Sequence, residues 1–171
     1  ETPMLLDEAS IKQIKKLGIK FNIIETNIDE RIRRFDQLRE EARSNRLGGW
    51  YSDYKTWGEV NTKLQALEDS APDIATTFIV GQTHEGRDIH GIRISAPGST
   101  EGRKQVLFNG CQHAREWIAV MVPTYAAEHL VEGWSNDPEV QAYLETTEVI
   151  IVPIVNPDGY EFTYAPSGDR Y

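Results

Sequence analysis

The stretch Val106–Ala119, "VLFNGCQHAREWIA", joins an apolar run to a cluster of polar and charged side chains. The apolar run is typical of a β-strand, and the Asn-Gly pair that follows it predicts the end of that strand. His113, Arg115 and Glu116 come directly afterwards. Ligands of α/β proteins bind beyond the carboxyl ends of strands, so a functional site is favoured here.

The spacing of three residues between His113 and Glu116 places both side chains on one side of a helical turn or tight loop. A neutral imidazole and a carboxylate are both good Zn²⁺ ligands, and a catalytic zinc site uses three protein ligands plus one position for water. The same residues also fit the start of a helix, where the helix dipole favours Glu116. The spacing alone leaves both interpretations open.

Strands and helices alternate on both sides of this stretch. Residues 74–98 predict two strands joined by a turn at "THEGRD". The strand at 103–110 has an apolar centre that suits burial on both faces, and residues 147–164 predict a further buried strand that ends in a turn at "NPDG". Helices are predicted at 51–73, 115–134 and 137–146. This alternation predicts an α/β fold with a mixed, mostly parallel sheet flanked by helices.

The first part of the chain predicts a separate pattern of helix, strand and helix. Apolar residues recur at helical spacing in 7–18, residues 19–25 form a short β-rich run, and a second amphipathic helix occupies 27–46. Asn27 followed by Glu30 predicts the start of that second helix. Arg43 and Arg46 lie beside the join "SNRLGG", where a trypsin-like protease could cut an exposed segment.

Charge and composition exclude several classes of function. The net charge is −9 over 171 residues, and the first 49 residues carry ten basic against nine acidic side chains, which leaves the acidic excess in the rest. An acidic main body argues against nucleic-acid binding. No apolar run is long enough to span a membrane, and no signal peptide is visible at the first residues. The single cysteine, Cys111, excludes an intrachain disulfide and a CxxC zinc site.

Three motifs occur in order along the chain: "THEGRDIHGIRIS", "NGCQHAREWIA" and "IIVPIVNPDGYEFTY". Together they resemble the zinc metallocarboxypeptidases related to pancreatic carboxypeptidases A and B, whose pattern is EGR(D/P)I, then HxREW, then NPDG(Y/F)xFT. The resemblance implies the N-terminal part of the carboxypeptidase fold in residues 47–171. Residues 1–46 resemble the tail of that family's propeptide, a remnant of a small α/β domain followed by a linker helix.

The resemblance implies a role for each residue that matches the HxREW motif. His113 and Glu116 correspond to two of the three zinc ligands, and Arg115 corresponds to an arginine that helps to hold the substrate peptide. One Zn²⁺ per full-length domain is implied. The implied reaction removes single C-terminal amino acids from peptides, after a protease has activated the zymogen.

Other parts of the family's site have no counterpart in this sequence. The third zinc histidine, the catalytic glutamate and the oxyanion arginine are expected after Tyr171, so the chain resembles an incomplete fragment that is inactive alone. His84, His90 and His129 are not convincing substitutes for the missing ligand. The propeptide-like segment favours a secreted, vacuolar or lysosomal protein.

Two other functions stay open from the sequence. A catalytically inactive relative could keep His113 and Glu116 and act as a zinc-binding protein. A zinc deacylase of related fold is the other candidate, although the propeptide-like segment and "HAREW" favour a peptidase. The residues that separate these functions, and those that choose the substrate side chain, are expected beyond Tyr171.

Overall fold

The computed structural model describes residues 6–44 and 49–164. The chain divides into two compact units, residues 1–47 and residues 48–171. Within the described ranges, no helix is both long enough and apolar enough to cross a lipid bilayer.

The first unit contains two helices, α1 (Glu8–Lys16) and α2 (Ile28–Ser44). At the start of α1, the Asp7 carboxylate accepts a hydrogen bond from the Ser10 N–H at 2.7 Å. Just after the end of α1, Gly18 has a φ of +69°. Asn27 begins α2 in the same way, because its side chain accepts the Glu30 N–H at 3.0 Å. Both helices begin where the sequence predicts them.

The prediction of a strand at 19–25 is wrong, because these residues form no strand in the structure. Their side chains are all exposed, including Ile24 at 83%. An extended segment needs a neighbouring strand to pair its N–H and C=O groups, and the described part of this unit offers none. Of the two arginines predicted to lie at a cleavage site, Arg46 is outside the described residues and Arg43 is described only as backbone of α2.

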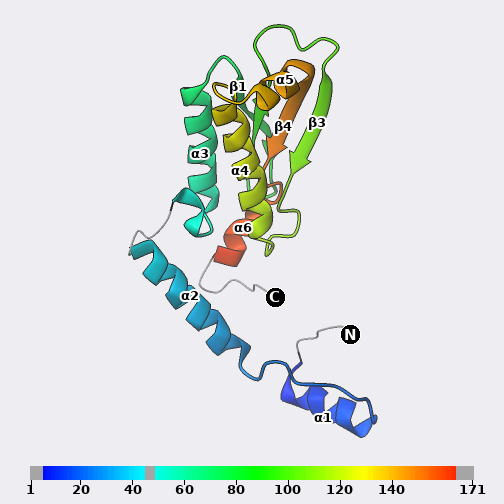
Figure 1. Cartoon of the computed structure of the whole chain (residues 1–171). Helices are drawn as coiled ribbons and strands as arrows, with labels where there is room; N and C mark the ends of the chain where they lie inside the picture. The colour runs from blue at the N-terminus through cyan, green and yellow to red at the C-terminus, as the bar shows by residue number, and fades with distance from the viewer. Residues whose placement is uncertain (1–5, 45–48, 165–171) are drawn as a thin grey trace. The chain divides into compact units, whose positions relative to one another are not determined.

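The second unit contains the sheet and the remaining helices (Figure 1). After a short 3₁₀ turn at Trp50–Ser52, its elements are α3 (Trp57–Ser70), β1 (Ala75–Gln82), β2 (Asp88–Ile94), β3 (Lys104–Asn109), α4 (Ile118–Gly133), α5 (Pro138–Thr146), β4 (Thr147–Val152) and α6 (Pro157–Tyr164). Thr56 begins α3 with a complete capping box to Glu59, and Asp137 begins α5 one residue before its proline. These helices lie within the predicted segments.

The strands form one mixed sheet in the order β1-β2-β4-β3. β1 pairs with β2 and β2 pairs with β4 in antiparallel fashion, whereas β3 and β4 are parallel. The sheet is therefore mixed as predicted, although the parallel pairing is one of three among the described strands. The hairpin of β1 and β2 turns at the predicted "THEGRD" segment.

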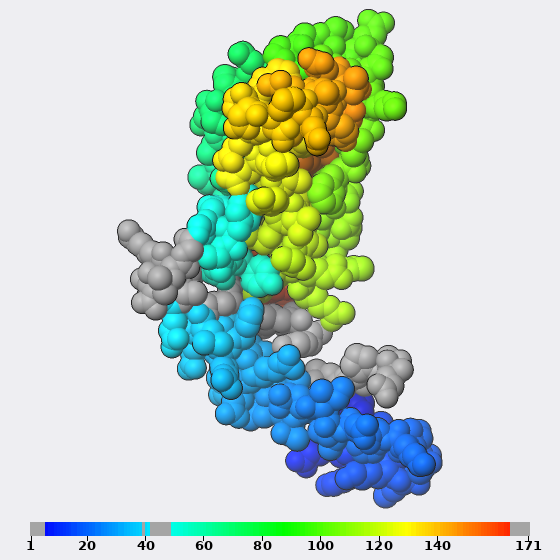
Figure 2. Space-filling view, in the orientation of Figure 1, coloured from blue at the N-terminus to red at the C-terminus, as the bar shows by residue number. Residues whose placement is uncertain are grey.

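The main core lies between the sheet and helices α3, α4 and α5. Leu64 of α3, Leu144 of α5 and Ile151 of β4 are almost completely buried in it. A second buried cluster surrounds Trp117 and Tyr160 near α6. The space-filling view shows α4 and α5, in yellow and orange, on the face of this unit that is turned to the viewer (Figure 2).

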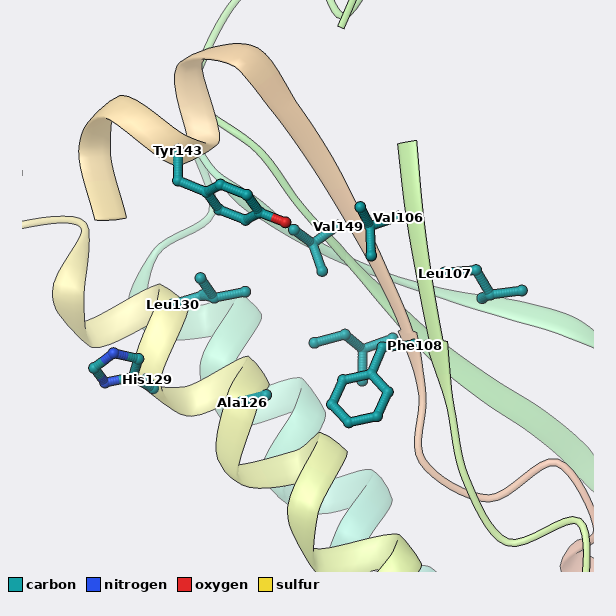
Figure 3. Close-up of a pocket in the computed structure, with 9 residues that line it drawn as sticks. Val106, Leu107, Phe108, Ala126, His129, Leu130, Tyr143 and Val149 are labelled. Atoms are coloured by element: carbon teal, nitrogen blue, oxygen red, sulfur yellow. The ribbon is translucent and has the colours of Figure 1, made fainter. Parts of the chain in front are cut away.

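The prediction that the third strand is buried on both faces is wrong. β3 is exposed along its whole length, with Leu107 at 62%. It lies at the edge of the sheet, where only β4 pairs with it among the described residues. Val106 and Phe108 point towards α4 and α5, and residues 106–108 of β3 line one side of an apolar groove of about 320 Å³ (Figure 3).

The "NPDG" segment begins a helix and does not form the predicted isolated turn. The Asn156 side chain accepts the Gly159 N–H at 3.1 Å, and Pro157 occupies the first position of α6. A proline and an asparagine suit a helix start as well as a turn, so composition could not separate the two.

Candidate metal site

His113 and Glu116 lie in the turn between the end of β3 and the start of α4. The Glu116 N–H donates to the His113 carbonyl at 3.0 Å, which closes the turn. Their side chains meet, with His113 Nδ1 and Glu116 Oε1 at 3.1 Å. The two side chains are 76% and 52% exposed, so both donor atoms are open to solvent and to a ligand.

This geometry fits two donors to one zinc ion. Ligand atoms at normal Zn–N and Zn–O distances in a tetrahedral site lie about 3.3 Å apart, close to the 3.1 Å that separates these two atoms. Among the described residues, no group of three or more His, Cys, Asp or Glu side chains could hold a metal ion. The part of the chain that the structure describes therefore offers two donors at this position.

The other residues singled out from the sequence lie apart from one another. Arg115 is exposed between the two donors in the turn, and His84 is exposed in the β1–β2 turn. His90 lies on β2 and packs against Trp57 with ring centroids 5.8 Å apart. His129 stacks on Tyr125 in α4. No contact links His84, His90 or His129 to the donor pair.

Cys111 precedes the donors and is completely buried. Its backbone has a φ of +58°, an uncommon conformation for a residue with a side chain. Burial, together with the nearby Glu116 carboxylate, raises the pKa of the Cys111 thiol to about 12. The thiol is therefore neutral near pH 7 and packs as a small buried apolar side chain.

The segment between β3 and α4 that carries His113 and Glu116 is called the donor turn. Backbone hydrogen bonds fix its start. The Gly110 N–H donates to the Val152 carbonyl at 3.0 Å, and the Val155 N–H donates to the Gly110 carbonyl at 3.1 Å. A Cβ atom at Gly110 would lie 2.0 Å from the Ala119 carbonyl oxygen, so the chain approaches the first turn of α4 too closely for any other residue.

The start of α6 lies against the middle of the donor turn. Asn156 Nδ2 donates to the Gln112 carbonyl at 3.2 Å. A Cβ atom at Gly159 would lie 2.8 Å from the Ala114 Cβ. After the turn, the Trp117 indole N–H donates to Thr163 Oγ1 of α6 at 2.8 Å.

Asp158, in the first turn of α6, forms hydrogen bonds to the β1–β2 turn. Its carboxylate accepts from Thr83 Oγ1 at 2.7 Å, from the Glu85 N–H at 3.0 Å and from the Arg87 guanidinium at 2.6 Å. Partial burial acts to raise the pKa of Asp158, but these bonds outweigh it and hold the pKa below its ordinary value. Arg87 thus forms an ion pair with Asp158, 71 positions away in the sequence.

The sequence profile of the zinc carboxypeptidase family matches residues 60–170, which include most of the second unit. The chain belongs to the zinc carboxypeptidase family. The match places the donor turn, the β1–β2 turn and the start of α6 in one family pattern, in agreement with the resemblance of the three sequence motifs.

Several curated relatives of this carboxypeptidase-family chain are similar in sequence. Metallocarboxypeptidase A of Trichophyton tonsurans is 31% identical over 67% of this chain and 27% of its own length. Carboxypeptidase B of Helicoverpa zea is 32% identical over 90% of this chain and 37% of its own length. An inactive metallocarboxypeptidase of Saccharomyces cerevisiae is 30% identical over 91% of this chain and 39% of its own length. The chain thus spans well under half the length of these relatives.

Solved structures show the same fold. The crystal structure of carboxypeptidase A from Helicoverpa armigera has a TM-score of 0.82, with 27% identity over 96% of this chain and 40% of its own. The structure of thrombin activatable fibrinolysis inhibitor has a TM-score of 0.76 at 21% identity, over 96% of this chain and 40% of its own, and supports the fold alone.

Proposed function

We propose that this chain is part of a zinc-dependent carboxypeptidase that removes single C-terminal amino acids from peptides, and that it supplies two of the three zinc ligands, His113 and Glu116. The observation that carries the proposal is the 3.1 Å approach of these two donor atoms at the end of β3 in a zinc carboxypeptidase fold. A His and a Glu three residues apart can also meet in an ordinary helical turn, so the family match over residues 60–170 gives the metal interpretation its additional support.

A bound zinc ion polarises the scissile carbonyl and lowers the pKa of a bound water. The chain's own contribution is to hold a nitrogen and a carboxylate oxygen at the correct separation. Arg115, exposed between them, is placed to contact the substrate peptide as a charged hydrogen-bond donor. The catalytic base, the oxyanion arginine and the third ligand belong to the proposed remainder of the protein.

We also propose that the chain is a piece of a longer protein. The limited share of the relatives that it spans supports this. The apolar side chains of β3 support it independently, because solvent-facing valine, leucine and phenylalanine on an unpaired sheet edge are costly and prone to association. On this basis the 171-residue chain alone is expected to be inactive.

The proposed zymogen follows from the division of the chain into two units. Residues 1–46 would be the propeptide tail and linker helix, and residues 47–171 the first part of the peptidase domain. Similarity to carboxypeptidase B of Helicoverpa zea over 90% of the chain supports this, because the match must include part of the first unit. Activation by a trypsin-like protease near Arg43 or Arg46, and a secreted, vacuolar or lysosomal location, stay predictions.

A second candidate function has an observation of its own. The similar protein from Saccharomyces cerevisiae is named an inactive metallocarboxypeptidase. A catalytically inactive zinc-binding protein is therefore the alternative, and it differs from the enzyme in residues outside this chain. The relatives named above give no such support for a zinc deacylase.

Zinc titration of the 171-residue chain tests the ligand assignment. The backbone amide NMR signals of Ala114 and Arg115, which lie between the two donors, should shift on addition of Zn²⁺, with the weak affinity of a two-donor site. His113→Ala and Glu116→Ala should each weaken binding by about tenfold or more, whereas His84→Ala, at an exposed histidine elsewhere, should not. Equal binding by wild type and both ligand variants would show that the assignment is wrong.

Peptidase assays of a longer form of the protein test the activity. Mass spectrometry of a model peptide should show a ladder of single C-terminal losses that His113→Ala abolishes. Zinc binding without a ladder would favour the inactive alternative, and absence of both would refute the proposed function.

A further inference from the structure

The donor turn is held against the start of α6 by a side-chain hydrogen bond and by a close approach of the two backbones. The start of α6 contributes one side-chain hydrogen bond, from Asn156, and one close contact, from Gly159, to the segment between Gln112 and Ala114. The same turn of α6 is fixed from its other side by Asp158 and the β1–β2 hairpin. The bond from Asn156 to Gln112 joins residues 44 positions apart in the sequence.

We propose that Asn156 is a positioning residue for the two metal donors, and that its amide presets the turn that carries His113 and Glu116. This proposal rests on the proposed function, because it assumes that the two side chains bind a metal. The side-chain hydrogen bonds of Asn156 go to Gln112 and Gly159 and not to either donor side chain, so its effect passes through the backbone of Gln112.

The amide of Asn156 has no freedom to reverse. The Gly159 N–H can only donate, so the amide end that it meets must be the oxygen Oδ1. Nδ2 therefore faces the Gln112 carbonyl and donates to it at 3.2 Å. One side chain thus begins α6 and at the same time fixes the peptide group that immediately precedes His113.

The close approach at Gly159 reinforces the same contact. A Cβ atom there would meet Asn156 Nδ2 at 2.7 Å and Ala114 Cβ at 2.8 Å. Only glycine lets α6 lie this near the turn, and the resulting contact restricts Ala114, which lies between the donors. Restricting the backbone on both sides of His113 reduces the entropy that a bound metal must otherwise remove.

Two substitutions separate this role from a general effect on stability. Asn156→Asp keeps the oxygen that accepts from Gly159 but replaces the amide donor to Gln112 with a second acceptor. Its added negative charge would by itself attract Zn²⁺, so a loss of affinity can be assigned to geometry. Asn156→Ala removes both bonds. Asn136→Ala, at an exposed asparagine between α4 and α5, is the matched control.

The test is a Zn²⁺ titration of the 171-residue chain followed by the backbone amide signals of Ala114 and Arg115, which every variant retains, with amide hydrogen exchange at Glu116 as a readout that needs no metal. We expect Asn156→Asp to weaken Zn²⁺ binding about threefold to tenfold and to speed the exchange of the Glu116 N–H, with little change in the melting temperature. Asn156→Ala should do the same with a lower melting temperature, and Asn136→Ala should change neither binding nor exchange.

The failures are distinguishable. If His113→Ala binds Zn²⁺ as the wild type does, the metal assignment is wrong and the positioning role is overturned with it. If His113→Ala loses binding while Asn156→Asp keeps both its affinity and its slow Glu116 exchange, the positioning role alone is refuted. If affinity falls only in proportion to melting temperature across the variants, Asn156 has a structural role alone and the proposal is also refuted.

Discussion

Strands β3 and β4 are neighbours with similar apolar sequences and opposite environments. β4 is buried, with Ile151 completely inaccessible, whereas every residue of β3 is exposed. The two strands run parallel and in register, with Leu107 beside Ile150 and Phe108 beside Ile151. The difference lies in their place in the sheet, because β4 has a partner on each side and β3 has β4 alone among the described strands.

This comparison shows that an apolar run predicts a strand without predicting how much of it the chain can cover. Valine, isoleucine and phenylalanine favour a strand at either position. Burial depends on what packs against the strand, which is decided by segments far away in the sequence. The exposed β3 therefore indicates an incomplete surface that the same chain does not cover within the residues described.

The largest expected effect is the difference between matched truncations in the two strands. Ile151→Ala should lower the free energy of unfolding by about 2–5 kcal/mol, because it leaves a cavity in the main core. Leu107→Ala should change it by no more than about 0.5 kcal/mol, because that side chain is largely in solvent already. Chemical denaturation of the 171-residue chain measures both.

The same pair sharpens the proposal of a longer protein. In a longer form whose additional residues cover β3, Leu107→Ala should become costly while the cost of Ile151→Ala stays similar. If the two substitutions lowered the free energy of unfolding of the 171-residue chain equally, β3 would already be covered in solution. The contrast between an exposed β3 and a buried β4 would then be wrong.

The next effect concerns the glycine at the end of β3. Gly110→Ala should destabilise the chain by about 1–3 kcal/mol, because the added methyl group must displace the first turn of α4. Gly58→Ala is the control, since that glycine lies in open space within α3, where alanine is the better helix former. Denaturation midpoints should move in opposite directions, and a shared direction would contradict the packing at Gly110.

The sequence predicts most elements of the second unit because their signals are local. The hairpin turn at "THEGRD" and the helices at 51–73 and 137–146 are each read from residues adjacent in the chain. The close pairing of His113 with Glu116 also follows from short spacing, and the family follows from ordered motifs. The signals that succeed all lie within about one turn of helix or one hairpin.

The failures share a different physical origin. Within residues 6–44 and 49–164, the run at 19–25 has strand-like residues but no partner strand, and the apolar residues of β3 stay exposed. The contact of Asn156 with Gln112 joins the segments that follow β4 and β3, which are neighbours because these two strands pair. The order of strands in the sheet and the hydrogen bonds between separate loops depend on residues far apart in the chain. Patterns among adjacent residues therefore do not predict them.

A smaller effect tests whether the exposed edge is prone to pairing. The 171-residue chain should self-associate with rising concentration, since β3 presents unpaired backbone and apolar side chains. Leu107→Lys should weaken that association with little effect on stability. Val80→Lys, on the opposite edge strand β1, should have less effect because a register irregularity between Ile79 and Gly81 already interrupts that edge. Sedimentation velocity distinguishes these outcomes, and an equal response of both variants would remove the special role of β3.

The smallest effect extends the comparison to a titrating side chain on an interior strand. His90 lies on β2 against Trp57, and burial lowers its pKa below the ordinary 6.5, although Asp88 opposes this. The unfolded chain therefore binds the proton more readily, so the contribution of His90 to stability is complete above pH 6.5 and is lost as the pH falls through and below that value. The stability of wild type relative to His90→Gln should fall accordingly between pH 7.5 and pH 5 in denaturation experiments, with His84→Gln, at an exposed histidine of the β1–β2 turn, as the control. If the difference in unfolding free energy between wild type and His90→Gln did not change with pH, His90 on β2 would be as accessible to water as Leu107 on the edge strand β3.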